Sequence, residues 1–187
     1  MAKILIAYAS GLGQTALIAG RVGQVLEKLG HKAVLSDVGA NPWPDVASHD
    51  AVLIAAPVRY SKHHQAVIAF CREQAAALRS RPSAFLAISL SAASVKPGGR
   101  REVAKAIAHF IKHTAWVPPR IEPVAGALAY TKYGFVIKRV IKLIAGFGGH
   151  SQDTSRDHEY TDWERVEAFA RSFSASLPGV AGVRSAA

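Results

Sequence analysis

Short apolar runs alternate with longer amphipathic segments along most of the chain. The first run, residues 3–9 (KILIAYA), is β-favouring and almost uninterrupted, which is typical of a strand buried on both faces. Apolar residues at helical spacing then predict a helix over 14–29, and Gly30 supplies a stop signal. The same alternation predicts four further strands, at 31–36, 51–56, 83–89 and 120–126.

Helical spacing of apolar residues recurs three more times. One helix is expected around Val67, Cys71, Ala75 and Leu78, and another around Val103, Ile107, Phe110 and Ile111. The last helix is expected to begin at Thr161, because Thr161 and Glu164 have the T-x-x-E form of a capping box, and its buried stripe runs from Val166 to Leu177. Residues 37–50 read as a loop with at most a short helical turn.

Strands that alternate with helices favour parallel pairing through right-handed crossovers. We therefore expect an α/β fold, a doubly wound five-stranded parallel sheet in one domain over residues 1–177, followed by a frayed tail at 178–187. Ligands of such sheets bind outside the carboxyl ends of the strands. That rule selects three loops, at 10–15, 57–62 and 89–99.

Composition narrows the class of protein. The 187 residues carry 23 Lys and Arg against 13 Asp and Glu, a formal charge of +10, so an anionic partner is expected. The cations are spread along the chain without the signature of a nucleic-acid module, so no nucleic-acid partner is predicted. A lone cysteine, Cys71, allows no internal disulfide, and no secretory signal or membrane-spanning run is recognised, which favours a cytosol-facing protein.

The loop after the first strand is the first candidate binding site, and it consists of Ser10, Gly11, Leu12, Gly13, Gln14 and Thr15. Its glycines, its hydroxyls and the N-terminus of the following helix suit a phosphate monoester. The loop lacks the lysine and spacing of a nucleoside triphosphatase motif. Gly11, Gly13 and Ala16 also match G-x-G-x-x-A, which with Asp37 leaves a dinucleotide site open, and a simple connecting turn is a third reading.

Two more loops could frame a planar ring next to that phosphate. Tyr60 could lie over a ring and Arg59 could carry charge toward an acidic ligand, although a proline turn with a surface tyrosine explains the second loop equally well. The third loop offers small side chains and backbone donors. Flavin mononucleotide (FMN) fits this layout, with the ring framed by Pro57, Val58, Arg59, Tyr60, Ser89, Leu90, Ser91 and Ala92.

The order of strands and helices and the three loops resemble flavodoxins. Residues 1 to about 177 more closely resemble the menaquinone-dependent protoporphyrinogen IX dehydrogenases of bacterial haem synthesis. This resemblance is carried by Arg59-Tyr60, Pro82 to Phe85, Trp116-x-Pro118, Ala125 to Leu128 with Tyr130, Ile141 to Ile144, Gly148-Gly149 with Asp153-Thr154, and Tyr160 to Trp163. It assigns no role to residues 94–101 (SVKPGGRR).

The resemblance implies an oxidoreductase with bound FMN that removes six electrons from protoporphyrinogen IX and passes them to menaquinone or another quinone. Arg59 is a candidate contact for the substrate propionates on charge grounds. No side chain is expected to act as a nucleophile, because the redox chemistry belongs to the cofactor. A flavodoxin-like electron carrier and an NAD(P)H:quinone reductase remain as alternatives.

An insertion at about 127–150 separates the fifth strand from the last helix. Lys132, Lys138, Arg139 and Lys142 fall on one side of a helical projection and the apolar residues on the other. Such a segment suits the surface of an anionic membrane, which predicts a peripheral protein on the cytoplasmic side of the inner membrane. Packing of the apolar side on the domain, or in a homo-oligomer, is the alternative.

No metal site is predicted. His109 and His113 are four residues apart on one helix, but no companion carboxylate accompanies them, and a solvated helix face is the simpler reading. Cys71 lies on the apolar stripe of its helix and is expected to pack rather than react.

Overall fold

A parallel sheet forms the centre of the computed structural model, which describes residues 1–59, 61–128 and 158–178. Its strands follow the order β2-β1-β3-β5-β6, and each neighbouring pair is parallel. They are β1 (Lys3–Tyr8), β2 (Lys32–Asp37), β3 (Ala51–Arg59), β5 (Ser83–Ser89) and β6 (Ile121–Ala125). The expected flavodoxin-like, doubly wound five-stranded sheet is confirmed.

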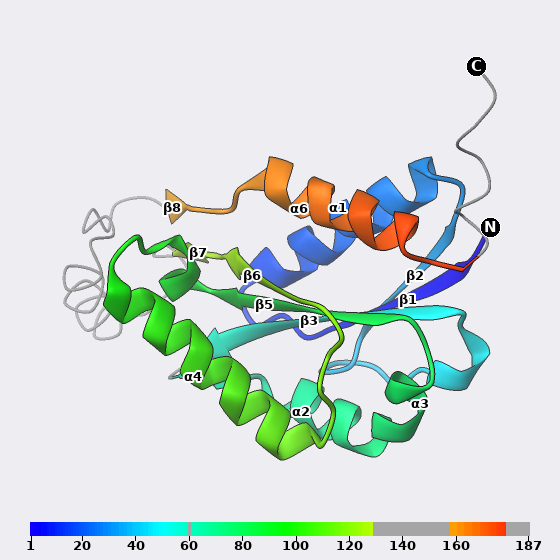
Figure 1. The fold of residues 1–187 in the computed structure, drawn as a ribbon, viewed down its shortest axis with the longest axis horizontal. Helices are drawn as coiled ribbons and strands as arrows, with labels where there is room; N and C mark the ends of the chain where they lie inside the picture. The colour runs from blue at the N-terminus through cyan, green and yellow to red at the C-terminus, as the bar shows by residue number, and fades with distance from the viewer. Residues whose placement is uncertain (60, 129–157, 179–187) are drawn as a thin grey trace.

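Helices cover both faces of the sheet (Figure 1). Helices α1 (Gln14–Lys28) and α6 (Trp163–Ala175) lie side by side on one face. The opposite face carries α2 (Gln65–Glu73), α3 (Ala75–Arg79) and α4 (Pro97–Thr114). The fold therefore has three layers, and alternate residues along each central strand face one helical layer or the other.

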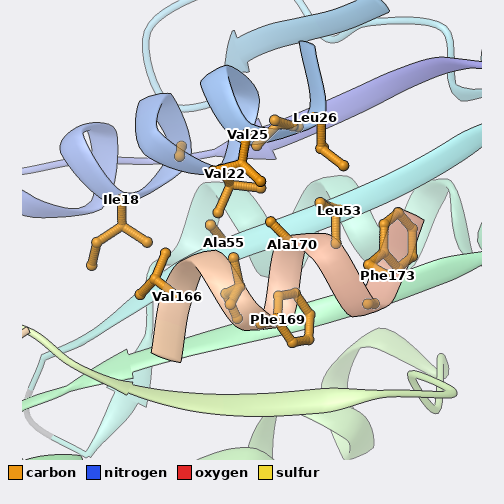
Figure 2. Close-up of a cluster of buried hydrophobic side chains, with 14 of the residues drawn as sticks. Ile18, Val22, Val25, Leu26, Leu53, Ala55, Val166, Phe169, Ala170 and Phe173 are labelled. Atoms are coloured by element: carbon orange, nitrogen blue, oxygen red, sulfur yellow. The ribbon is translucent and has the colours of Figure 1, made fainter. Parts of the chain in front are cut away.

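The core between the sheet and the first layer is aliphatic, with phenylalanines from α6. Figure 2 shows Ile18, Val22 and Leu26 of α1 directed toward α6, and Leu53 of β3 beneath both helices. The apolar stripe predicted for the last helix is buried here.

The second core contains more aromatic side chains. Phe85 of β5 and Phe110 of α4 stack with centroids 4.2 Å apart and an interplanar angle of 8°. Trp116 meets both rings edge-on and is fully buried. Cys71 is buried in this core, as its place in the sequence pattern predicts.

Several boundaries differ from expectation. Strand β3 was expected to end at 56, but Pro57, Val58 and Arg59 continue it rather than forming a loop. Pro57 pairs with Ile88 of β5, and the short strand β4 (Lys62–His63) pairs back onto residues 58 and 59. A proline that lacks an N–H suggested the end of the strand, but its carbonyl still accepts a hydrogen bond from His64 N.

The start of the last helix also differs. Asp162, not Thr161, is its N-cap, because Asp162 Oδ1 accepts a hydrogen bond from Arg165 N at 3.0 Å. Thr161 Oγ1 instead donates to the carbonyl oxygen of Ala125 at 2.9 Å. The hydroxyl therefore joins the end of β6 to the helix approach, and no capping box forms.

Smaller differences lie elsewhere. The helix expected around Val67 to Leu78 is divided at Gln74 into α2 and α3. Residues 37–50 contain the short helical turn allowed for there, a 3-10 helix at Val46–Ser48. No helix within the described residues is long and apolar enough to cross a membrane.

The insertion and the tail lie largely outside the described residues. Strands β7 (Ala127–Leu128) and β8 (His158–Glu159) form an antiparallel pair on either side of residues 129–157. Positions 128 and 158 are therefore neighbours. The predicted basic amphipathic segment falls on the residues between them, and most of the predicted tail falls on residues 179–187. Both segments lie outside the described residues, so both remain predictions.

Candidate functional site

The three loops selected from the sequence meet at one edge of the sheet. Strands β1, β3 and β5 are consecutive neighbours, so their carboxyl ends lie side by side. Residues 9–13 follow β1, the β3–β4 hairpin ends β3, and a 3-10 helix, η2 (Leu90–Ala93), follows β5. The first two loops flank the switch point between β1 and β3, where sheets of this order bind ligands.

The loop after β1 is held as a tight turn into α1. Gly13 has φ of +101°, which side-chain-bearing residues rarely adopt, and its carbonyl accepts the first hydrogen bond of the helix from Leu17 N. Ser10 Oγ accepts hydrogen bonds from Gly13 N at 3.1 Å and from Ala16 N at 3.4 Å. Ser10 therefore caps the turn in addition to being a candidate phosphate ligand.

Several donors remain at the N-terminus of α1. The backbone N–H groups of Gly11, Gln14 and Thr15 find no acceptor among the described residues. Thr15 as a residue is 3% exposed, and its hydroxyl, whose oxygen is not fully enclosed, likewise has no hydrogen-bond partner within that part of the chain. An accessible hydroxyl beside open N–H groups favours an oxyanion ligand, so this loop has the chemistry that a phosphate monoester requires.

The Gln14 side chain is hydrogen-bonded elsewhere and so is not available to bind a phosphate. Its Nε2 donates to Thr161 Oγ1 at 2.9 Å and to Glu159 Oε1 at 2.6 Å. These bonds join the start of α1 to the segment before α6, across 145 and 147 residues of sequence. Gln14 can still contribute its backbone N–H, while its amide fixes the loop relative to β8.

Arg59 is placed beside the phosphate loop, at the end of β3. A side-chain carbon at position 11 would lie 3.4 Å from Arg59 Nη1, so the guanidinium rests against the Gly11 backbone. The loop itself contains no cation, and Arg59 supplies one. Tyr60, the predicted ring-stacking residue, lies outside the described residues.

The loop after β5 turns tightly. Ser89 is an extended residue whose Oγ accepts a hydrogen bond from Ala92 N at 3.2 Å. Leu90, Ser91 and Ala92 are only partly buried, so they form an open wall at the carboxyl edge. The N–H of Ala92 is thus already bonded, which reduces the backbone donors expected of this loop.

Asp37, the residue on which a dinucleotide reading depends, lies at the end of β2. Its Oδ1 accepts a hydrogen bond from Gly39 N at 2.9 Å, and this bond closes a local turn. A structural role therefore accounts for the aspartate that the dinucleotide reading would use for a ribose.

His63 is a buried titratable residue near this edge that the sequence did not indicate. Its ring is 2% exposed, its Nδ1 lies 3.2 Å from the carbonyl oxygen of Ala56, and its Nε2 has no partner within the described chain. The ring contacts Phe85 and Phe110 edge-on. Burial lowers the pKa of His63 to about 4, so the ring is neutral at pH 7.

Other reactive groups fit structural roles. Burial raises the pKa of the Cys71 thiol far above its ordinary value, which makes a thiolate nucleophile unfavourable. The rings of His109 and His113 stack with centroids 4.0 Å apart, and no cluster of three metal-ligating side chains occurs in the described parts of the chain.

The structure places the three loops selected from the sequence at one edge of the sheet, but sequence reasoning missed several contacts within them. Nothing in the sequence pairs Gln14 with Glu159, or places the Arg59 guanidinium on Gly11. A local signal existed only for Ser10, because serine hydroxyls close to a helix start commonly accept hydrogen bonds from its first N–H groups.

Comparison with known proteins agrees with the architecture. The model of a flavodoxin domain family matches residues 5–155. Over 173 residues the chain is 36% identical to the protoporphyrinogen IX dehydrogenase [quinone] of Escherichia coli strain K12, covering 92% of this chain and 94% of that protein. The protein of the same name from Leishmania major is 27% identical over 177 residues, covering 92% of this chain and 75% of its own length.

Solved structures show the same fold at low identity. Oxidised flavodoxin 1 from Bacillus cereus superposes with a TM-score of 0.54 at 14% identity, covering 94% of this chain and 99% of its own. A flavodoxin from the domain Archaea gives 0.52 at 11% identity, with coverage of 94% and 98%.

Proposed function

From the premise that this chain belongs to the flavodoxin domain family, and within it to the family of protoporphyrinogen IX dehydrogenase [quinone], we propose that it oxidises protoporphyrinogen IX to protoporphyrin IX with a quinone as electron acceptor. The observation that carries this proposal is the 36% identity over almost the whole of both chains. Bound FMN would supply the redox chemistry, accepting hydride from the porphyrinogen and delivering electrons to the quinone.

The residues of the first loop fit the phosphate of FMN. The open N–H groups of Gly11, Gln14 and Thr15 and the Thr15 hydroxyl offer hydrogen bonds to an oxyanion. Gly11 and Gly13 let the backbone approach closely, and Leu12 completes the turn between them. The ring would then lie at the edge framed by residues 57–60 and 89–92.

Arg59 is proposed to meet a substrate carboxylate at the rim of this site. It is exposed, its guanidinium lies beside Gly11, and its backbone pairs with Lys62 of β4. Replacing Arg59 with Ala in FMN-saturated protein should raise the KM for the porphyrinogen with little change in kcat, because the guanidinium contributes binding rather than chemistry. An unchanged KM would remove Arg59 from the substrate site.

Menaquinone as the preferred quinone, and a peripheral position on the cytoplasmic side of the inner membrane, are further parts of the proposal. Quinones with long apolar tails reside in bilayers, so an enzyme that reduces them benefits from contact with a membrane surface. The six electrons and six protons lost by one porphyrinogen would reduce three quinones to quinols, so the acceptor must exchange repeatedly.

An anaerobic mixing experiment tests the proposed reaction against its alternatives. Protoporphyrinogen IX should bleach the flavin absorbance and yield fluorescent porphyrin, and a water-soluble quinone added afterwards should restore the flavin colour. Rapid bleaching by NAD(P)H instead would identify an NAD(P)H:quinone reductase. No bleaching by either reductant, with exchange only to redox proteins, would identify an electron carrier.

A further inference from the structure

The stretch from the end of η2 into the first turn of α4 carries a concentrated positive charge that the site described above does not use. Residues 94–101 (SVKPGGRR) contribute Lys96, Arg100 and Arg101 and no carboxylate. All three side chains are exposed. Within the described residues none of them forms an ion pair, and the neighbouring Glu102 is bonded to Lys105 at 3.0 Å. Their charge therefore faces solvent uncompensated.

An apolar side chain stands among these cations. Val95 is 86% exposed, which makes it one of the most exposed large apolar residues of the described chain. We call Val95, Lys96, Arg100 and Arg101 the α4 basic surface. A projecting apolar residue flanked by Lys and Arg is the pattern of a segment that inserts at the interface of an anionic bilayer.

This surface is held rigidly beside the candidate site. The Cβ of a residue at position 99 would lie only 2.4 Å from Ser94 Cβ and 3.0 Å from the carbonyl oxygen of Ser91, so the first turn of α4 packs tightly on η2. Ser94 N donates to Ser91 O at 3.1 Å, and Lys96 N donates to Ser94 Oγ at 3.3 Å. The first turn of α4 therefore lies at the same edge of the fold as the loop expected to frame the flavin (Figure 1).

We propose that the α4 basic surface docks the protein on an anionic lipid bilayer, with Val95 inserted and Lys96, Arg100 and Arg101 among the head groups. The choice of a bilayer rests on charge complementarity, on the exposed valine, and on the proposed function, whose quinone acceptor is a lipid-soluble molecule. Docking in this way brings the carboxyl edge of the sheet, and so the candidate site, next to the membrane.

The test is vesicle binding by the full-length protein, with two variants of equal charge. Arg100→Gln with Arg101→Gln removes two cations from the surface, whereas Arg72→Gln with Lys112→Gln removes two exposed cations elsewhere in the same layer. Lys112 lies about 18 Å from Arg100 along α4, which is beyond the ~8 Å over which charge acts at physiological salt. Both variants should keep the wild-type unfolding temperature, because all four side chains are exposed.

Vesicles of phosphatidylcholine with added phosphatidylglycerol are compared with vesicles of phosphatidylcholine alone. Each near-surface cation contributes about fivefold to partition onto an anionic bilayer, so the Arg100 and Arg101 variant should bind about thirtyfold more weakly. The Arg72 and Lys112 variant should bind nearly as well as wild type. Val95→Ser should give a smaller loss that persists at high salt, because the valine contributes apolar burial.

Three results would overturn the proposal. The two double variants could lose vesicle binding equally, or the wild-type protein could bind both kinds of vesicle with equal strength. The third is that the Arg100 and Arg101 variant loses only its retention by duplex DNA, measured in parallel. Because binding is measured without turnover, its outcome is separate from that of the proposed function. A protein that holds no flavin but loses vesicle binding only in the Arg100 and Arg101 variant would support the docking surface and refute the proposed reaction.

Discussion

The two helical layers of this protein use charge in opposite ways. The α1 and α6 layer, counting residues 14–28 and 159–175, carries four cations and five carboxylates. Its charges are partly paired, since Glu167 accepts a hydrogen bond from Arg171 at 3.2 Å and forms an ion pair with Arg21 at 3.7 Å. Residues 59–114, which supply the other layer and the hairpin before it, carry ten cations and two carboxylates. The excess charge within the described chain is therefore concentrated on one side.

The cores beneath the layers also differ. The first core is mainly aliphatic, and its polar neighbour is the His31 ring, hydrogen-bonded to Ser174 at 2.7 Å. The second surrounds His63 with phenyl rings and leaves its Nε2 without a partner in the described chain. The first layer is thus nearly balanced in charge, whereas the second holds an excess of cations and a buried, unpartnered ring nitrogen within the described chain, and both features lie beside the candidate site.

The largest expected effect separates the two cores by their response to pH. Phe110→Ala and Phe169→Ala each remove a buried phenyl ring and should each lower the free energy of unfolding by about 4 kcal/mol at pH 7. Only Phe110→Ala opens the surroundings of His63, so only this variant should raise the pKa of that ring. Urea unfolding at pH 7 and pH 5 measures both quantities. If the two variants showed the same pH dependence of unfolding, His63 would not owe its lowered pKa to burial against Phe110.

Protonation of His63 gives the next effect. The pKa is lowered to about 4 in the folded protein from 6.5, so the unfolded chain binds the proton more readily between these values. The contribution of neutral His63 to the free energy of unfolding is therefore fully present above pH 6.5 and is lost as the pH falls toward 4. At pH 4 the free energy of unfolding is lower by about 3 kcal/mol. His63→Phe should remove this loss, and exposed His113→Phe should retain it. An unaltered pH profile in His63→Phe would mean that other groups titrate.

Adjacent glycines at the start of α4 allow a matched steric test. Gly99→Ala should destabilise the protein by about 2 kcal/mol, because the added carbon would lie 2.4 Å from Ser94 Cβ. Gly98→Ala meets nothing within 4 Å and should be neutral or slightly stabilising. Thermal unfolding of both variants, and of Gly99→Ala with Ser94→Gly as the relief variant, checks the packing of α4 on η2. Equal stability of the two alanine variants would show that this packing is loose.

The smallest effect concerns the first layer at its helix start. Asp162→Ala should cost about 1 kcal/mol, because Arg165 N loses its capping acceptor. Glu164→Gln should cost much less, since no capping box is present. If Glu164→Gln were as damaging as Asp162→Ala, the carboxyl group of Glu164 would be contributing to the cap after all. Chemical denaturation at pH 7 resolves the difference.

Hydrophobic periodicity was sufficient to predict the main strands along the chain, and the rule for parallel sheets then selected the loops at their carboxyl ends. Buried strands such as residues 83–89 and amphipathic helices such as α1 bear a local pattern that survives in the fold. Local pattern failed where a tertiary partner decided the outcome. Pro57 remains in a strand because β4 and β5 pair around it, and Thr161 leaves the helix because Ala125 and Gln14 bind its hydroxyl.

The same distinction holds within the candidate site. The glycine and hydroxyl pattern of residues 10–15 predicted an anion-binding turn, since that chemistry is local. The placement of the Arg59 guanidinium on Gly11, and the burial of His63 between two phenyl rings, depend on residues far apart in the sequence. Composition likewise showed an excess of positive charge, but not that the excess within the described residues is concentrated in one helical layer.

Binding of FMN and riboflavin by the same apoprotein tests the central claim most directly. The two ligands share the ring and differ by the phosphate, which the turn after β1 is proposed to hold through Gly11, Gln14 and Thr15. Titration followed by quenching of flavin fluorescence should show FMN bound at least about a hundredfold more tightly than riboflavin, as expected for several charge-assisted hydrogen bonds. Equal affinity for both ligands, or binding of neither, would contradict the account.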